Sequence, residues 1–178
     1  MSRPNSPESD NGLYRYAASD LLRSVHVSVA VGYYLEALIA TLPTLEQHAL
    51  EFRHARVVPL ACGVAIIPIT DDLYDEVANG GEVDRFSKLS PGIEQWAQHM
   101  SAIAPVTYIE AEFFGGVGGQ GAVAWSLASR VLGPIHSKDA INQALRFLGV
   151  QTGEAYDEFE AVGLGRHRTT DDWIEPNR

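Results

Sequence analysis

The feature that most constrains the fold is a run of apolar side chains at every second position, early in the chain. The positions between them hold smaller or polar residues, among them His26, Ser28 and Glu36. Alternation with β-branched residues is typical of a strand with one buried face. We predict a strand over residues 25–39 with a break or bulge near Gly32, because strands rarely run so long. The apolar members are Val25, Val27, Val29, Val31, Tyr33, Leu35, Ala37 and Ile39.

The rest of the chain mixes strand and helix patterns. Residues 106–114 alternate in the same way, and residues 57–69 and 122–135 each predict a hairpin. Helices are expected to begin at Thr44, Thr70 and Ser90, and to cover residues 139–148 and 154–162. This order favours one α+β domain with a mostly antiparallel or mixed sheet and helices packed on one side.

The length and the first residues suggest the domain limits. The chain has 178 residues, which suits one domain. Residues 1–24 are expected to be a flexible N-terminal extension, since their first part is rich in Pro, Ser and Asn. Residues 25–178 would form the domain, with residues 163–178 as its C-terminal tail. Trp173 is expected to anchor this tail by packing.

Charge and composition exclude several classes of partner. The 13 Lys and Arg residues against 23 Asp and Glu residues give a net charge of −10, which repels nucleic acid and anionic lipid. The single cysteine, Cys62, cannot form an internal disulfide or a zinc site with two thiolates. No run of residues is apolar enough for a membrane span or a signal peptide, so we expect a cytoplasmic protein. No cofactor is predicted.

A glycine-rich segment follows the strand at residues 106–114. Residues 116–121 match the G-x-G-x-x-G pattern that lets backbone N–H groups approach a pyrophosphate. A dinucleotide-binding fold carries this pattern on its first strand, with further strand–helix units after it. A structural loop is therefore favoured here, and binding of a phosphate, a nucleotide or a partner is the alternative. The candidate binding residues are Gly116, Gly118, Gly119 and Gly121.

Three glutamates form the first candidate site. Glu110 and Glu112 are two residues apart on one strand and so point the same way, while Glu36 faces away from the buried side of its own strand. If the two strands are neighbours, the three carboxylates converge and could perform acid–base chemistry. The ordinary alternative is a solvated sheet face.

A basic cluster in the tail forms the second candidate site. Arg166 and Arg168 could hold a carboxylate or phosphate, and His167 is a natural proton carrier near neutral pH. They could equally pair with the acidic helix just upstream. The pair Glu51 and His54 resembles half of a di-iron site, but no second pair exists, so no metal site is predicted.

Three segments carry a family resemblance: GYYLEA at 32–37, EAEFFGGVG at 110–118 and DEFEAVGLGRHR at 157–168. They resemble a group of small bacterial proteins of uncharacterised activity. The resemblance implies a bacterial, cytoplasmic, single-domain protein and transfers no catalytic residue.

The leading hypothesis for function is a non-enzymatic, acidic protein-interaction module, for example an immunity- or antitoxin-like inhibitor of a basic partner. The charge of −10 and the acidic residues 154–160 motivate it. The alternative is a small enzyme, or a protein that binds phosphate or another small molecule. Its cleft would be formed by Glu110, Glu112, the glycine segment and residues 166–168. A third hypothesis is a homo-oligomer built through exposed sheet edges.

Overall fold

The computed structural model describes residues 32–175 and contains one six-stranded antiparallel sheet. The strands lie in the order β2-β3-β1-β4-β5-β6. They are β1 (Tyr33–Thr41), β2 (Val58–Pro59), β3 (Val64–Pro68), β4 (Val106–Phe114), β5 (Val117–Ser126) and β6 (Ser129–His136). The helices are α1 (Leu42–Ala49), α2 (Asp71–Val77), α3 (Pro91–Ser101), α4 (Ala140–Phe147) and α5 (Glu158–Val162), followed by the short 3-10 helices η1 (Leu164–Arg166) and η2 (Asp171–Trp173).

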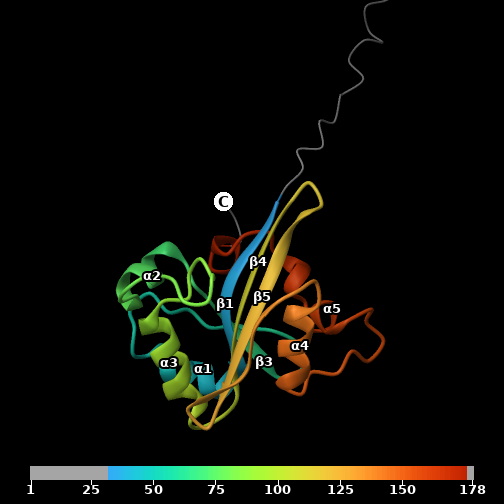
Figure 1. Cartoon of the computed structure of the whole chain (residues 1–178). Coiled ribbons are helices and arrows are strands. Elements are labelled where there is room, and N and C mark those ends of the chain that lie inside the picture. Colours follow the sequence, from blue (N-terminus) through green and yellow to red (C-terminus); the bar gives the residue numbers. More distant parts are fainter. Residues whose placement is uncertain (1–31, 176–178) are drawn as a thin grey trace, which may run out of the picture.

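Helices cover both faces of the sheet (Figure 1). On one face α1, α2 and α3 pack around Leu38, Tyr108 and Trp125. On the other face α4, α5 and the two 3-10 helices pack around Leu35 and Ile109. The prediction of one α+β domain with an antiparallel sheet is confirmed. The helices were expected on one side of the sheet but lie on both. The apolar side chains of the central strands point to both faces, so each face needs a cover.

Strand β1 shows this burial most clearly. Leu35 and Leu38 point to opposite faces, and both are fully buried. The expectation of a strand with one buried face is therefore wrong for residues 35–40. Glu36 is buried as well, on the same face as Leu38. Residues 25–31 of the predicted strand lie outside the described residues.

Hydroxyl side chains cap two of the five helices. Thr70 and Ser90 cap α2 and α3 as predicted, accepting hydrogen bonds from Leu73 N and Ile93 N. Helix α1 begins at Leu42 rather than Thr44, with the Thr41 and Thr44 hydroxyls 2.8 Å apart. Proline residues lie in the first turns of α1 and α3. Proline is tolerated there because it lacks a backbone N–H that would have no partner within the helix.

Two segments have other bounds in the structure than the sequence predicted. The turn after β4 occupies Gly115 and Gly116 only, and β5 begins at Val117, so three of the candidate glycines are strand residues. Helix α5 starts at Glu158 instead of 154, because the Asp157 side chain accepts a hydrogen bond from Glu160 N and caps the helix there. Between residues 32 and 175 no helix has the length and apolar character needed to cross a membrane.

Candidate functional site

The antiparallel pairing of β1 with β4 brings the three predicted carboxylates to one face. Glu36 lies directly opposite Glu110, and Tyr34 lies opposite Glu112. Residues directly opposite on an antiparallel pair have Cβ atoms about 4.5–5.5 Å apart. The expected convergence of these glutamates is therefore present at the level of the backbone register.

The environment of Glu36 is that of a buried acid. Its Oε2 accepts a hydrogen bond of 2.7 Å from the Thr170 hydroxyl, while Oε1 is buried with no hydrogen-bond partner among the described residues. Burial raises the pKa of the Glu36 carboxyl, and the nearby Glu110 carboxylate adds to this. Tyr34, Thr170 and Lys88 act in the opposite direction without reversing the shift.

Glu110 is held by the loop that precedes α3. Its carboxylate accepts hydrogen bonds from the backbone N–H of Ser87 (2.9 and 3.0 Å) and of Lys88 (3.4 Å), and from the Tyr108 hydroxyl (2.9 Å). These contacts fasten residues 87–88 to the sheet. Burial and the adjacent carboxylate raise the pKa of Tyr108 well above its usual value. Most of the accepting capacity of Glu110 is therefore used within the fold.

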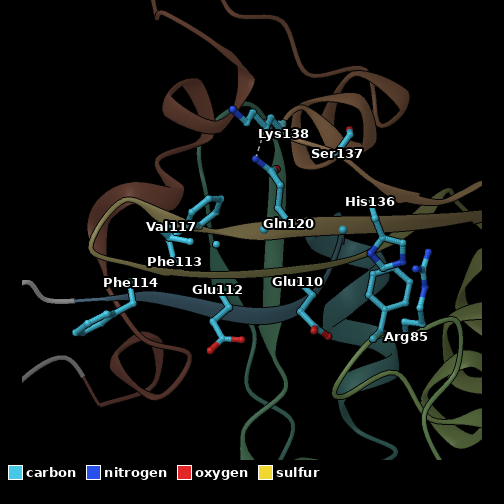
Figure 2. Close-up of a pocket in the computed structure, with 14 residues that line it drawn as sticks. Arg85, Glu110, Glu112, Phe113, Phe114, Val117, Gln120, His136, Ser137 and Lys138 are labelled. Atoms are coloured by element: carbon cyan, nitrogen blue, oxygen red, sulfur yellow. Dashed lines mark hydrogen bonds between the residues drawn. The ribbon is translucent and has the colours of Figure 1, made fainter.

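Glu110 and Glu112 do line a common cavity, of about 530 Å³, with the glycine-bearing part of β5. Figure 2 shows both carboxylates on one side of the strands and Gln120 on the other, hydrogen-bonded to the Lys138 carbonyl. Arg85, His136 and Lys138 supply basic groups to this cavity. Gly121 allows the Phe86 ring to pack against β5, since a Cβ at this position would lie 2.5 Å from that ring.

The glycine segment does not have the geometry of a dinucleotide-binding loop. That loop leads from a strand into a helix, whose N-terminus receives the phosphates. Here β4 leads through Gly115 and Gly116 into β5, and the next helix is α4. Contact of Gly118, Gly119 and Gly121 with some other ligand stays a prediction.

The basic cluster at 166–168 lies away from the glutamates. Arg166 donates to the carbonyls of Pro59 and Gly163 and lies over the Trp173 ring, 5.1 Å from its centroid. His167 also contacts Trp173, which is buried as predicted. Arg168 lines a second cavity, of about 390 Å³, which the glutamates do not line. None of the three lines the Glu110 and Glu112 cavity, so the predicted joint cleft is not formed.

The acidic helix that motivated the interaction hypothesis is partly engaged within the fold. Glu158 is buried and accepts a hydrogen bond of 2.8 Å from Arg146. Glu160 accepts from Tyr156 N, and Asp157 is the cap of α5. Asp157 and Glu158 join α5 to Asn142 and Arg146 of α4, so these two carboxylates serve the packing of the two helices.

An acidic surface does exist elsewhere, where η2 lies beside the start of α2. A groove of about 460 Å³ separates them, and we call it the acidic groove. Five carboxylate residues line it, and among the described residues no Lys, Arg or His does so. The lining residues are Thr70, Asp71, Asp72, Thr169, Asp171, Asp172, Ile174 and Glu175.

The carboxylates of the acidic groove differ in how they are held. Lys88, 2.8 Å from Asp71, lowers the pKa of that carboxyl, and the Thr169 hydroxyl lowers the pKa of Asp172. Within residues 32–175, the side chains of Asp72 and Asp171 make no hydrogen bond or ion pair. Both side chains are exposed and line the groove, so their negative charges are available to a bound ligand.

Sequence reasoning missed this groove, although a signal was present. The triplet Thr-Asp-Asp occurs twice, at 70–72 and at 170–172. Each copy has a local explanation, since Asp residues suit the first turn of a helix. Only the fold shows that the two copies face one groove.

The chain was compared with protein-family models, with curated proteins and with solved structures, and none of the three comparisons gave a match. The function is therefore argued from the geometry of the site.

Proposed function

We propose that this protein is a protein-interaction module that binds a basic segment of a partner protein in the acidic groove. The observation that carries the proposal is the convergence of Asp71, Asp72, Asp171 and Asp172 on one concave surface. Two of these residues precede the others by 100 positions in the sequence, so local helix capping alone does not account for their meeting.

The charge balance of the groove fits a cationic ligand. Lys88 neutralises Asp71, and the remaining acids leave a net negative groove on a chain whose net charge is −10. Such a field steers a basic partner during diffusion and raises its association rate. An Arg side chain can also bind a carboxylate through two parallel hydrogen bonds, which gives the contact geometric specificity.

The finer form of the proposal is an inhibitor, of the immunity or antitoxin kind, in a bacterial cytoplasm. An acidic groove that covers the cationic substrate-binding surface of a partner would block it. The negative charge supports this form, because the partners of such inhibitors carry basic surfaces that act on anionic substrates.

The experiment uses fluorescent peptides of defined sequence. One peptide alternates Arg and Gly, a second has Glu in place of Arg, and binding is followed by anisotropy at about 50 mM and about 300 mM salt. We expect the Arg peptide to bind with an affinity that falls in salt, and amide NMR shifts to concentrate at Thr70, Asp72 and Asp171. Absence of binding by the Arg peptide at low salt contradicts the proposal.

A matched pair of variants separates the groove from net charge. Asp72→Asn with Asp171→Asn removes two charges from the groove, and we expect affinity for the Arg peptide to fall about tenfold or more. Asp75→Asn with Glu154→Gln removes two exposed charges outside it and should change affinity less than about twofold. Equal losses from the two double variants would show that the groove has no special role.

The cavity beside Glu112 supports a second candidate function, binding of a small molecule or catalysis on one. Glu110 and Glu112 share this cavity with Arg85, His136 and Lys138, so it presents both signs of charge. Such a lining suits a zwitterionic or phosphorylated metabolite. A ligand-observed NMR screen of these two classes tests it. A genuine hit must weaken in both Glu112→Gln and Arg85→Gln.

A further inference from the structure

We propose that His48, Glu51 and His99 form a binding site for a divalent transition-metal ion. His48 lies in the last turn of α1, Glu51 in the turn after it, and His99 in the last turn of α3. One ligand atom of each lies within 4.8 Å of the ligand atoms of the other two. This site is separate from the acidic groove, so the two proposals can fail independently.

The hydrogen bonding of His48 indicates where an ion would bind. Its Nδ1 lies 2.5 Å from Glu51 Oε1, while Nε2 is buried without a hydrogen-bond partner. A proton on Nε2 alone would bury an unpaired N–H and leave two lone pairs facing each other at Nδ1. The favoured tautomer therefore carries its proton on Nδ1. An ion held by both His48 and Glu51 must therefore bind on the Nδ1 edge of the ring, in place of the proton that Nδ1 shares with Oε1, and that proton moves to Nε2.

The surroundings give the site both rigidity and access. The His48 ring is buried and lies at 88° to the His99 ring, with centroids 5.1 Å apart. Glu51 and His99 are exposed. A buried His would fix the site, and the two exposed ligands would let an ion and its remaining water molecules enter.

The ligand set defines the class of ion. Two imidazoles and one carboxylate suit Zn²⁺, Fe²⁺, Co²⁺ or Ni²⁺, whereas Mg²⁺ and Ca²⁺ prefer oxygen ligands. Ligand atoms around tetrahedral zinc lie roughly 3.3 Å apart, given bonds of about 2.0–2.1 Å. Small rotations of the exposed Glu51 and His99 side chains would bring the three groups from the observed separation to this one. With three protein ligands, at least one coordination position stays open to water.

His54 provides a built-in comparison. It is a near neighbour of Glu51 in sequence, yet its Nδ1 lies 3.1 Å from Glu76 Oε2 on α2. Helix α1 ends at Ala49, so Glu51 and His54 do not share a helix face as the sequence pattern suggested. The partner of Glu51 is His48, and His54 is excluded from the group.

The experiment measures binding of Co²⁺ and Zn²⁺ to the chain without an affinity tag. We expect one Co²⁺ per chain, with visible absorption bands more intense than those of the aqueous ion, and displacement of Co²⁺ by Zn²⁺ in calorimetry. Because His99 and Glu51 are exposed, His99→Gln and Glu51→Gln should fold normally, which circular dichroism checks. Each should weaken binding about tenfold or more, while His54→Gln should leave it unchanged.

Two results would overturn the proposal. One is a Co²⁺ spectrum that stays that of the aqueous ion at about millimolar protein. The other is binding that survives both His99→Gln and Glu51→Gln. The groove variant Asp72→Asn with Asp171→Asn serves as a second control, since loss of Co²⁺ there would trace the ion to carboxylates of the acidic groove and contradict the assignment.

Discussion

The Thr170 hydroxyl forms two hydrogen bonds with Glu36: it accepts one from the backbone N–H at 3.1 Å and donates one to Oε2 at 2.7 Å. Strand β3 pairs with β1 only from Ala37 onward, so residues 33–36 of β1 have no strand partner on that side. The carbonyl of Arg168 accepts from Tyr34 N at 2.8 Å, beside the Thr170 contacts. Residues 168–170 therefore cover the open edge of β1 and give partners to the backbone N–H groups of Tyr34 and Glu36 and to Glu36 Oε2.

Thr170→Val should destabilise the protein by about 1–3 kcal/mol, because it leaves the Glu36 N–H and carboxyl without their partner at nearly constant side-chain volume. Urea unfolding measures the change in free energy. Thr152→Val is the control, since Thr152 is half-buried and its hydroxyl bonds to no described residue. Equal effects from the two variants would contradict a bridging role for Thr170.

Glu36→Gln should alter how stability depends on pH. The pKa of Glu36 lies above its ordinary value of 4.5, so the folded protein keeps a proton that the unfolded chain has already released. The folded state then binds more protons, and the free energy of unfolding of the wild type falls as pH rises above about 4.5. The variant has no such proton, so its stability relative to the wild type should improve with rising pH.

Urea titrations at several values between about pH 4 and about pH 8 measure this difference. Glu112→Gln, on the same sheet face but exposed, is the control for general charge effects. A difference between wild type and Glu36→Gln that is constant over this range would show that the buried carboxyl does not shift.

Substitution by alanine should destabilise the protein much more at Gly118 than at the neighbouring Gly119 of β5. A Cβ at Gly118 would collide with the Glu112 carbonyl oxygen and lie 2.6 Å from Phe113 Cα, whereas at Gly119 it would meet nothing within 4 Å. Gly118→Ala should therefore cost about 2–3 kcal/mol, and Gly119→Ala less than about 1 kcal/mol. Thermal unfolding of the two variants decides it, and a harmful Gly119→Ala would indicate a different hairpin register.

Arg130→Met should destabilise the protein by about 1–2 kcal/mol, a value reduced for the partial exposure of the group. Arg130 joins Asp84, at 2.5 Å, and Glu94 of α3 to strand β6. The variant leaves these two carboxylates without their cation. Arg53→Met is the control, since Arg53 is exposed and its side chain pairs with no described residue. Thermal unfolding in low and high salt should show a smaller loss for Arg130→Met in high salt.

Local patterns were sufficient to predict most of the elements. Alternation defined β4 and both of its faces, and Thr70 and Ser90 marked two helix starts that the structure confirms. The spacing of apolar residues also predicted which face of α3 packs on the core, and Ile93, Trp96 and Met100 on that face are buried. These features depend on neighbours within a few residues, which is the range that sequence periodicity covers.

The features that failed depend on distant contacts. Glu36 was expected in solvent, yet Thr170 supplies a partner that makes its burial tolerable. The acids of α5 were considered as partners of the basic tail at 166–168, yet it is Arg146 of α4 that binds Glu158. The acidic groove and the pairing of His48 with Glu51 and His99 likewise arise where separate helices or turns meet. No local pattern contains that information.

The cover on β1 also has a consequence for synthesis of the chain. The residue that completes the edge of β1 is made 134 positions after Glu36, and β4, on the other edge, is itself a late partner. On the ribosome, β3 and β4 can pair with β1 as they emerge, but the edge of β1 at residues 33–36 stays uncovered until residues 168–170 have been translated. Unpaired strand edges in nascent chains promote aggregation, so we expect slow, largely post-translational folding that benefits from holdase chaperones.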